Sequence, residues 1–120
     1  METKTGEPKW PWPDELDARV AAPQYHALLL ENERVRVLDV RIPPGHTVPV
    51  HTHRWPAILH VLSAGQLVRR DGEGNVLLDT RTVDASPQLS FVLWSEPFPP
   101  HSVENVGNTE IRVISIELKD

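Results

Sequence analysis

The sequence contains no cysteine, which excludes disulfide bonds, thiolate metal ligands and cysteine nucleophiles. Any bound metal must therefore be held by nitrogen and oxygen atoms. The sequence also has no apolar run long enough to cross a bilayer, and residues 1–12 are polar and proline-rich, without the apolar centre of a secretion signal. We therefore expect a cytoplasmic protein that does not contact membranes.

Basic patches are missing as well. The 12 lysines and arginines are scattered, and 17 acidic residues outweigh them to give a formal net charge of −5. This charge pattern excludes an electrostatic surface for nucleic acid, so we expect a small molecule as the ligand or substrate. No Gly-x-Ser-x-Gly nucleophile motif and no phosphate-binding glycine loop is present either.

Long helices are disfavoured by 12 prolines in 120 residues, and what the chain contains instead is a series of short strand patterns. A glycine-containing turn at 71–75 predicts a hairpin. Many short strands without intervening helices predict an all-β antiparallel sandwich or barrel. The expected strands cover residues 27–30, 35–42, 48–53, 58–62, 66–70, 76–78, 88–94, 100–103 and 111–118.

The length predicts a single core, and we divide the chain into an N-terminal region, 1–26, and one barrel domain, 27–120. Trp10 and Trp12 alternate with prolines, which predicts an extended arm that docks on the barrel or on a second subunit. A short helix is expected over residues 14–22. The arm and the exposed strand edges of a small barrel together predict a homodimer.

Histidines form the most informative pattern. His51 and His53 lie two residues apart in a predicted strand, so both imidazoles should point to the same side. His101 belongs to another predicted strand and is the third member of the set. Three neutral imidazoles around an open coordination position are typical of a catalytic transition-metal site. The alternative is that all three are ordinary strand histidines.

The other histidines are not assigned to this site. His60 has the opposite parity to the His51 and His53 pair, so we expect it to point outward. His46 follows a turn glycine, and His26 follows Pro23 closely. We expect both of these side chains to face solvent.

With these histidines, Gly45 and Asn105 complete a pattern that resembles the two motifs of the cupin superfamily. The resemblance spans roughly residues 35–118 and implies a double-stranded β-helix, or jelly-roll barrel. In cupins with this pattern, the residues that match His51, His53 and His101 bind a metal inside the barrel. From the residues themselves, we expect Gly45 to form a turn and Asn105 to stabilise the turn after its strand.

The sequence departs from the cupin pattern in two places. Ala57 stands where the first motif normally has a glutamate ligand, and Pro99 and Pro100 replace a Pro-x-Gly turn before His101. In lacking the glutamate, the chain looks similar to three-histidine enzymes such as cysteine dioxygenase and the acetylacetone-cleaving dioxygenase. A neutral ligand set leaves more positive charge on the ion and should favour anionic or chelating substrates.

Four residues are candidates for the substrate pocket. Arg36 and Arg69 could grip a substrate carboxylate through two hydrogen bonds, although most arginines face solvent. Trp55 could form a pocket wall or simply pack, and Ala57 marks the space left by the missing glutamate.

Three functions follow from these expectations. The first is a non-haem iron(II) dioxygenase that acts on a small organic molecule, as the resemblance implies. The second is an isomerase or lyase that uses the same three histidines, and zinc, manganese and nickel are the alternative divalent ions. The third is a ligand-binding module without turnover.

Overall fold

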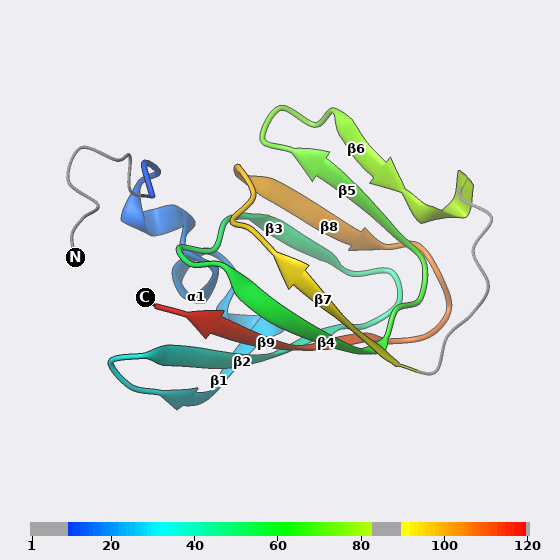
Figure 1. The fold of residues 1–120 in the computed structure, drawn as a ribbon. Coiled ribbons are helices and arrows are strands. Elements are labelled where there is room, and N and C mark those ends of the chain that lie inside the picture. Colours follow the sequence, from blue (N-terminus) through cyan, green and yellow to red (C-terminus); the bar gives the residue numbers. More distant parts are fainter. Residues whose placement is uncertain (1–9, 83–89, 120) are drawn as a thin grey trace.

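The computed structural model describes residues 10–82 and 90–119. Within these ranges the chain forms a five-stranded sheet, in the order β1-β2-β9-β4-β7, and a four-stranded sheet, in the order β3-β8-β5-β6. All neighbouring strands are antiparallel, and the two sheets face each other (Figure 1). The all-β jelly-roll prediction is confirmed.

Two of the predicted strands have the observed bounds, and most of the others differ by one or two residues. The first two residues of the predicted strand 88–94 lie outside the described residues.

In the described part of the chain, no helix is long and apolar enough to span a membrane. The strands are β1 His26–Glu31, β2 Val35–Ile42, β3 Thr47–His51, β4 Ala57–Ser63, β5 Leu67–Asp71, β6 Val76–Asp79, β7 Phe91–Ser95, β8 His101–Asn105 and β9 Ile111–Leu118; the helical segments are η1 Asp14–Leu16, α1 Ala18–Ala21, η2 Pro23–Tyr25 and η3 Thr80–Thr82.

The helix predicted over 14–22 is broken at Asp17. This residue has an extended backbone, with φ −58° and ψ 140°, and its carboxylate accepts a hydrogen bond from the N–H of Arg19 at the start of α1. The extended backbone lets Asp17 form a parallel bridge with Thr52. The N–H of Thr52 donates to the carbonyl of Leu16 at 2.7 Å, and the N–H of Ala18 donates to the carbonyl of Thr52 at 3.0 Å. Tertiary pairing therefore overrides the local helix preference.

The same pairing explains why β3 is shorter than predicted. The predicted strand runs to residue 53, but β3 ends at His51 because Thr52 pairs with the N-terminal segment. Residues 1–9 of the predicted arm lie outside the described residues. Trp10 lies below the guanidinium of Arg54, which is 4.1 Å from the centre of its ring.

Gly45 and Asn105 have the turn roles expected from the sequence. Gly45 has φ +82°, a left-handed conformation that glycine adopts without steric cost. The buried Asn105 amide donates to the carbonyls of Ile42 and Thr109, both at 2.8 Å, and its oxygen accepts from the N–H of Gly107 at 2.9 Å. Both residues hold loops in place and lie outside the cavity lining described below.

The outer face of the five-stranded sheet is largely apolar. One register row crosses all five strands through Leu30, Val37, Ile116, Ile58 and Trp94. Trp94 is 56% exposed, so it does not belong to the core. The homodimer remains a prediction.

Candidate metal centre

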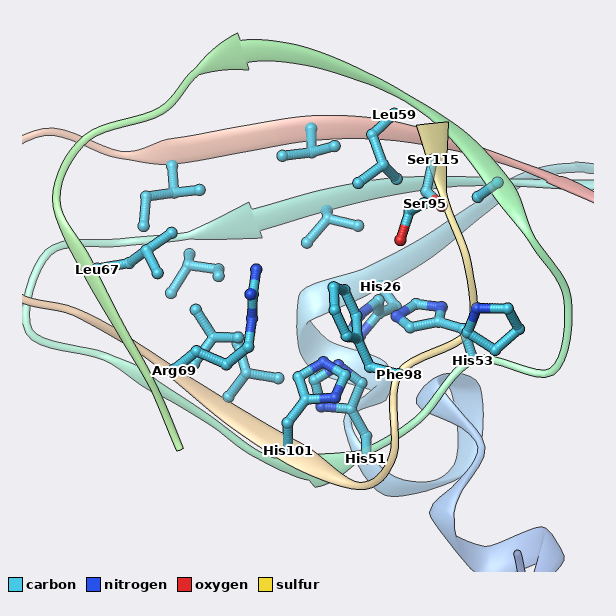
Figure 2. A pocket seen from close by; sticks show the side chains of 18 of the residues that line it. His26, His51, His53, Leu59, Leu67, Arg69, Ser95, Phe98, His101 and Ser115 are labelled. Atoms are coloured by element: carbon cyan, nitrogen blue, oxygen red, sulfur yellow. The ribbon is translucent and has the colours of Figure 1, made fainter. Parts of the chain in front are cut away.

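A cavity of about 150 Å³ lies between the two sheets (Figure 2). Its volume is comparable to that of engineered cavities that hold one benzene molecule. Histidines line one end of the cavity, and aliphatic side chains from both sheets line much of the rest, together with Trp55, Arg69, Ser95, Glu96, Phe98 and Ser115. These aliphatic residues are Val40, Ile42, Val48, Leu59, Leu67, Val103, Ile111 and Val113.

The three histidines selected from the sequence all line this cavity. His51 on β3 and His101 on β8 are cross-strand partners, and their ring centroids are 4.6 Å apart. His53, two residues beyond His51, has its ring centroid 5.3 Å from that of His51. His46 and His60 lie outside the cavity lining, as expected: His46 is exposed, and His60 pairs with the exposed Val92.

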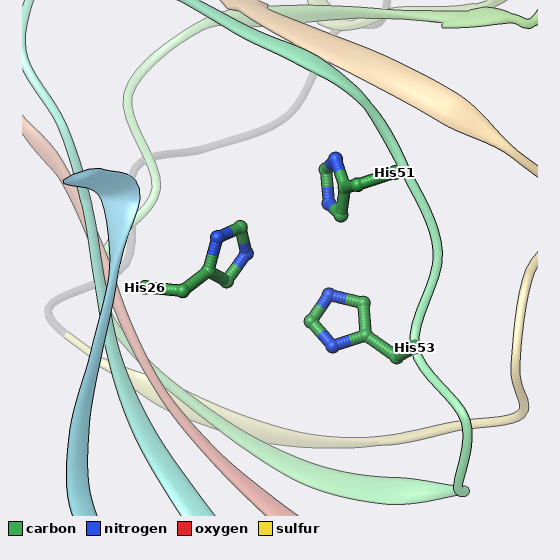
Figure 3. A group of neighbouring side chains, drawn as sticks. All are labelled: His26, His51 and His53. Atoms are coloured by element: carbon green, nitrogen blue, oxygen red, sulfur yellow. The ribbon is translucent and has the colours of Figure 1, made fainter. Parts of the chain in front are cut away.

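His26 joins the cluster, so the expectation that it faces solvent is wrong. It is only 2% exposed, and its ring centroid is 4.9 Å from that of His51 and 5.3 Å from that of His53 (Figure 3). One ring nitrogen from each of these three residues lies within 4.8 Å of the other two. The tightest group is therefore His26, His51 and His53, and His101 lies beside His51.

Sequence reasoning missed His26 because its position depends on a long-range pairing. His26 is the first residue of β1, where it pairs with Val40 of β2, and Val40 lines the cavity. A strand pattern extended by one residue would have included His26. It would not have shown that this end of β1 lies over the cavity.

All four imidazoles are anchored through Nδ1. A carbonyl oxygen can only accept a hydrogen bond, so Nδ1 carries the proton in His26, His51 and His101, and Nε2 keeps its lone pair. Because a metal binds the unprotonated nitrogen, this arrangement fits a divalent ion held by Nε2 atoms. The Nδ1 partners are the carbonyls of Ala22 for His26 at 2.9 Å, Pro49 for His51 at 2.8 Å and Pro99 for His101 at 2.8 Å, and the carboxylate of Glu117 for His53 at 2.5 Å.

Comparison with solved structures shows which proteins share this arrangement of sheets. A cupin domain from Bordetella pertussis Tohama I is similar at 26% identity and a TM-score of 0.58, over 79% of this chain and 92% of that chain. The chain has the fold of the cupin superfamily. No family model matches the sequence, and a search of curated proteins finds no significant match.

Two more distant structures share the cupin fold. One is a conserved protein with a double-stranded β-helix domain from Klebsiella pneumoniae, at 18% identity and a TM-score of 0.53 over 78% of this chain and 75% of that chain. The other is a polyketide cyclase from Streptomyces resistomycificus, at 16% identity and a TM-score of 0.52 over 79% of this chain and 64% of that chain. At these identities the likeness concerns the fold alone.

Burial keeps three of the four imidazoles uncharged. Burial, together with the neighbouring His101, His53 and His26, lowers the pKa of His51 to about 2. Burial also lowers the pKa of His26 to about 4, with a contribution from His53, and it lowers the pKa of His101 to about 4. At neutral pH these three imidazoles are in the state that a metal requires.

A buried ionic network lies behind His53. Glu117, which is 0% exposed, accepts from the Nε–H of Arg36 at 2.6 Å through one oxygen and from His53 through the other. The remaining Arg36 nitrogens donate to both oxygens of Asp17, at 3.0 and 3.1 Å. Burial raises the pKa of Glu117, but the hydrogen bonds and charges of His53 and Arg36 lower it more. Arg36 is thus occupied by two carboxylates and lies outside the cavity lining.

This network also supplies a carboxylate beside Ala57, the position where the cupin pattern has a glutamate. Ala57 lines the cavity and is the cross-strand partner of Glu117. Position 57 has no carboxylate, but Glu117 on the neighbouring strand β9 has one. It orients His53 by accepting a hydrogen bond from Nδ1 of the ring. Trp55 lines the cavity too, and its ring centre is 5.0 Å from the guanidinium carbon of Arg36.

Proposed function

We propose that this cupin binds a divalent metal ion through Nε2 of His26, His51 and His53, with His101 as a further imidazole at the same end of the cavity. The observation that supports the proposal is the common anchoring of four imidazoles through Nδ1 in one cavity, three of them buried, which leaves Nε2 available to a metal. This extends the predicted set of His51, His53 and His101 by one residue from β1.

Of the reactions such a site could support, we propose an iron(II)-dependent oxygenase acting on a small organic molecule. When bound, the ion would supply a Lewis acid with open positions for a substrate and dioxygen. The chain itself excludes water with aliphatic walls and holds the imidazoles in one tautomer. Because the imidazoles are neutral, the site keeps the ionic charge and favours an anionic substrate.

The donor set favours a second candidate. Imidazole nitrogens alone, without a carboxylate, form a ligand set that also suits zinc. With zinc, or with nickel or manganese, the same cavity would support an isomerase or lyase reaction in which a carbonyl of the substrate is polarised. The two candidates differ in whether turnover consumes oxygen.

Metal content is the first test. After loading with iron(II) or zinc and desalting, we expect elemental analysis to find about one ion per chain in the wild type and little in His51→Ala. The matched control is His46→Ala, because His46 is exposed and lies outside the cavity lining. Circular dichroism establishes that each variant is folded. Equal metal content in wild type and folded His51→Ala contradicts the proposal.

Oxygen consumption is the second test. We expect the iron-loaded protein to consume oxygen with at least one member of a panel of diketones, thiols and phenols. Turnover of a substrate by the zinc-loaded protein without oxygen supports the isomerase or lyase instead. Ligand binding without any turnover supports the ligand-binding module.

A further inference from the structure

Arg69 projects into the cavity from the four-stranded sheet (Figure 2). Its guanidinium carbon lies 4.6 Å from the ring centre of Phe98, and this ring is 5.4 Å from the ring of His101. The aromatic ring is therefore a neighbour of both the guanidinium and His101. A ligand in the cavity can contact Arg69 and the histidine end at the same time.

The guanidinium of Arg69 has no hydrogen-bond acceptor within residues 10–82 and 90–119, and its Nε is fully buried. Arg70, the next residue, forms an ion pair with Glu104 at 2.9 Å. Glu96 also lines the cavity, but its carboxylate accepts a hydrogen bond from the indole N–H of Trp94 at 2.6 Å. Arginine stays protonated, so Arg69 presents to the cavity a positive charge that has no hydrogen-bonded counter-ion among the described residues.

From this geometry we infer that Arg69 binds the carboxylate of a small, largely apolar monocarboxylate in the cavity. The inference deepens the proposed function and rests on it, since it names the class of molecule that would be the substrate. A guanidinium and a carboxylate have matching planar geometry and can form two parallel hydrogen bonds.

Charge and space decide the class of anion. One guanidinium balances the single charge of a carboxylate, whereas a phosphate monoester carries nearly two charges and needs more donors than this wall provides. The walls are mainly apolar, and a volume of about 150 Å³ accommodates roughly one six-membered ring. The body of the ligand should therefore be apolar and no larger than a phenyl group.

Calorimetric titration of the full chain tests the inference. The probes are benzoate, phenylacetate and 4-methylpentanoate, each beside its neutral amide, added to protein stripped of metal with EDTA. We expect the wild type to bind at least one acid more tightly than its amide. Arg69→Met should lower the affinity for that acid roughly tenfold or more, because a charge-assisted hydrogen bond is lost, and change the amide affinity less than twofold. The matched control, Arg70→Met, should leave both affinities unchanged.

Two results overturn the inference. One is that no acid binds the wild type more tightly than its amide, and the other is that Arg69→Met and Arg70→Met weaken acid binding equally. If Arg69→Met does not fold, Arg69→Lys replaces it, and a lysine variant with unchanged acid affinity counts against the two-bond geometry. Because the titration contains no metal, failure of metal binding by the wild type leaves this result intact, and the two proposals fail separately.

Discussion

Two arginines, Arg36 behind the histidines and Arg69 in the cavity wall, differ in the partners that surround their charges. Behind the histidines, Arg36 is hydrogen-bonded to Asp17 and Glu117, and these two carboxylates hold the pKa of its guanidinium above the ordinary value although burial lowers it. On the opposite sheet, Arg69 lies beside the Phe98 ring and has no hydrogen-bond acceptor among the described residues, and burial lowers its pKa. A buried charge with partners stabilises the scaffold, whereas one without partners is ready for a ligand.

The largest expected effect is a loss of stability at low pH, and its source is the group of buried histidines. The pKa values of His26 and His101 are lowered to about 4 and that of His51 to about 2, while unfolded histidine titrates near 6.5. Below pH 6.5 the unfolded chain binds more protons than the folded one. The free energy of unfolding of the metal-free protein should therefore decrease as the pH falls from about 6.5 to 4, by an amount on the order of 5 kcal/mol.

Urea titrations at several pH values measure this dependence. The variant His26→Leu removes one of the buried imidazoles and should make the dependence on pH shallower. His46→Leu is the control, because His46 is exposed and lies outside the cavity lining. A wild-type protein whose stability is constant between pH 7 and 4 contradicts the prediction.

Removal of Arg36 should have the next largest effect. Arg36→Met leaves the carboxylates of Asp17 and Glu117 buried without a counter-charge, so we expect a loss of about 3–5 kcal/mol in the free energy of unfolding. The control is Arg41→Met, which removes a half-exposed ion pair with Asp39 and should cost about 0–1 kcal/mol. Chemical denaturation measures both, and similar losses in the two variants would show that the network is not structural.

Glu117 should affect metal affinity more than a surface acid does. In Glu117→Gln the side chain keeps its shape but loses the charge that orients and polarises His53, and the affinity for zinc should fall by about 10- to 100-fold. Competition with a chromophoric chelator measures the affinity. Glu104→Gln, which removes a partly exposed partner of Arg70, should leave it unchanged. Equal zinc affinities in both variants would show that Glu117 does not influence metal binding.

The smallest expected effect is an increase in stability rather than a loss. Arg69→Met replaces an unpartnered, desolvated charge with an apolar side chain in an apolar cavity, so we expect the protein to gain about 1 kcal/mol of stability. Arg70→Met, which breaks a surface ion pair, should change stability by less than about 1 kcal/mol in the destabilising direction. A clear loss of stability in Arg69→Met would mean that Arg69 has a structural partner, and the contrast with Arg36 would disappear.

Local sequence patterns were sufficient for much of the fold. Turn residues and hydrophobic periodicity located the strands, and β2 Val35–Ile42 and β9 Ile111–Leu118 have the predicted bounds. The two-residue spacing of His51 and His53 predicted that both rings point to the same side, and both line the cavity. These features depend on residues close together in the chain, so the sequence alone determines them.

Only the tertiary structure decided which further residues surround the histidines. His26 reaches them because β1 pairs with β2, and Glu117 stands beside Ala57 because β9 pairs with β4. Arg36 and Arg69 are equivalent in the sequence, but one meets two carboxylates and the other meets an aromatic ring. Long-range strand pairing sets the neighbours and the burial of each charge, and these in turn decide whether a charged side chain supports the fold or faces a ligand.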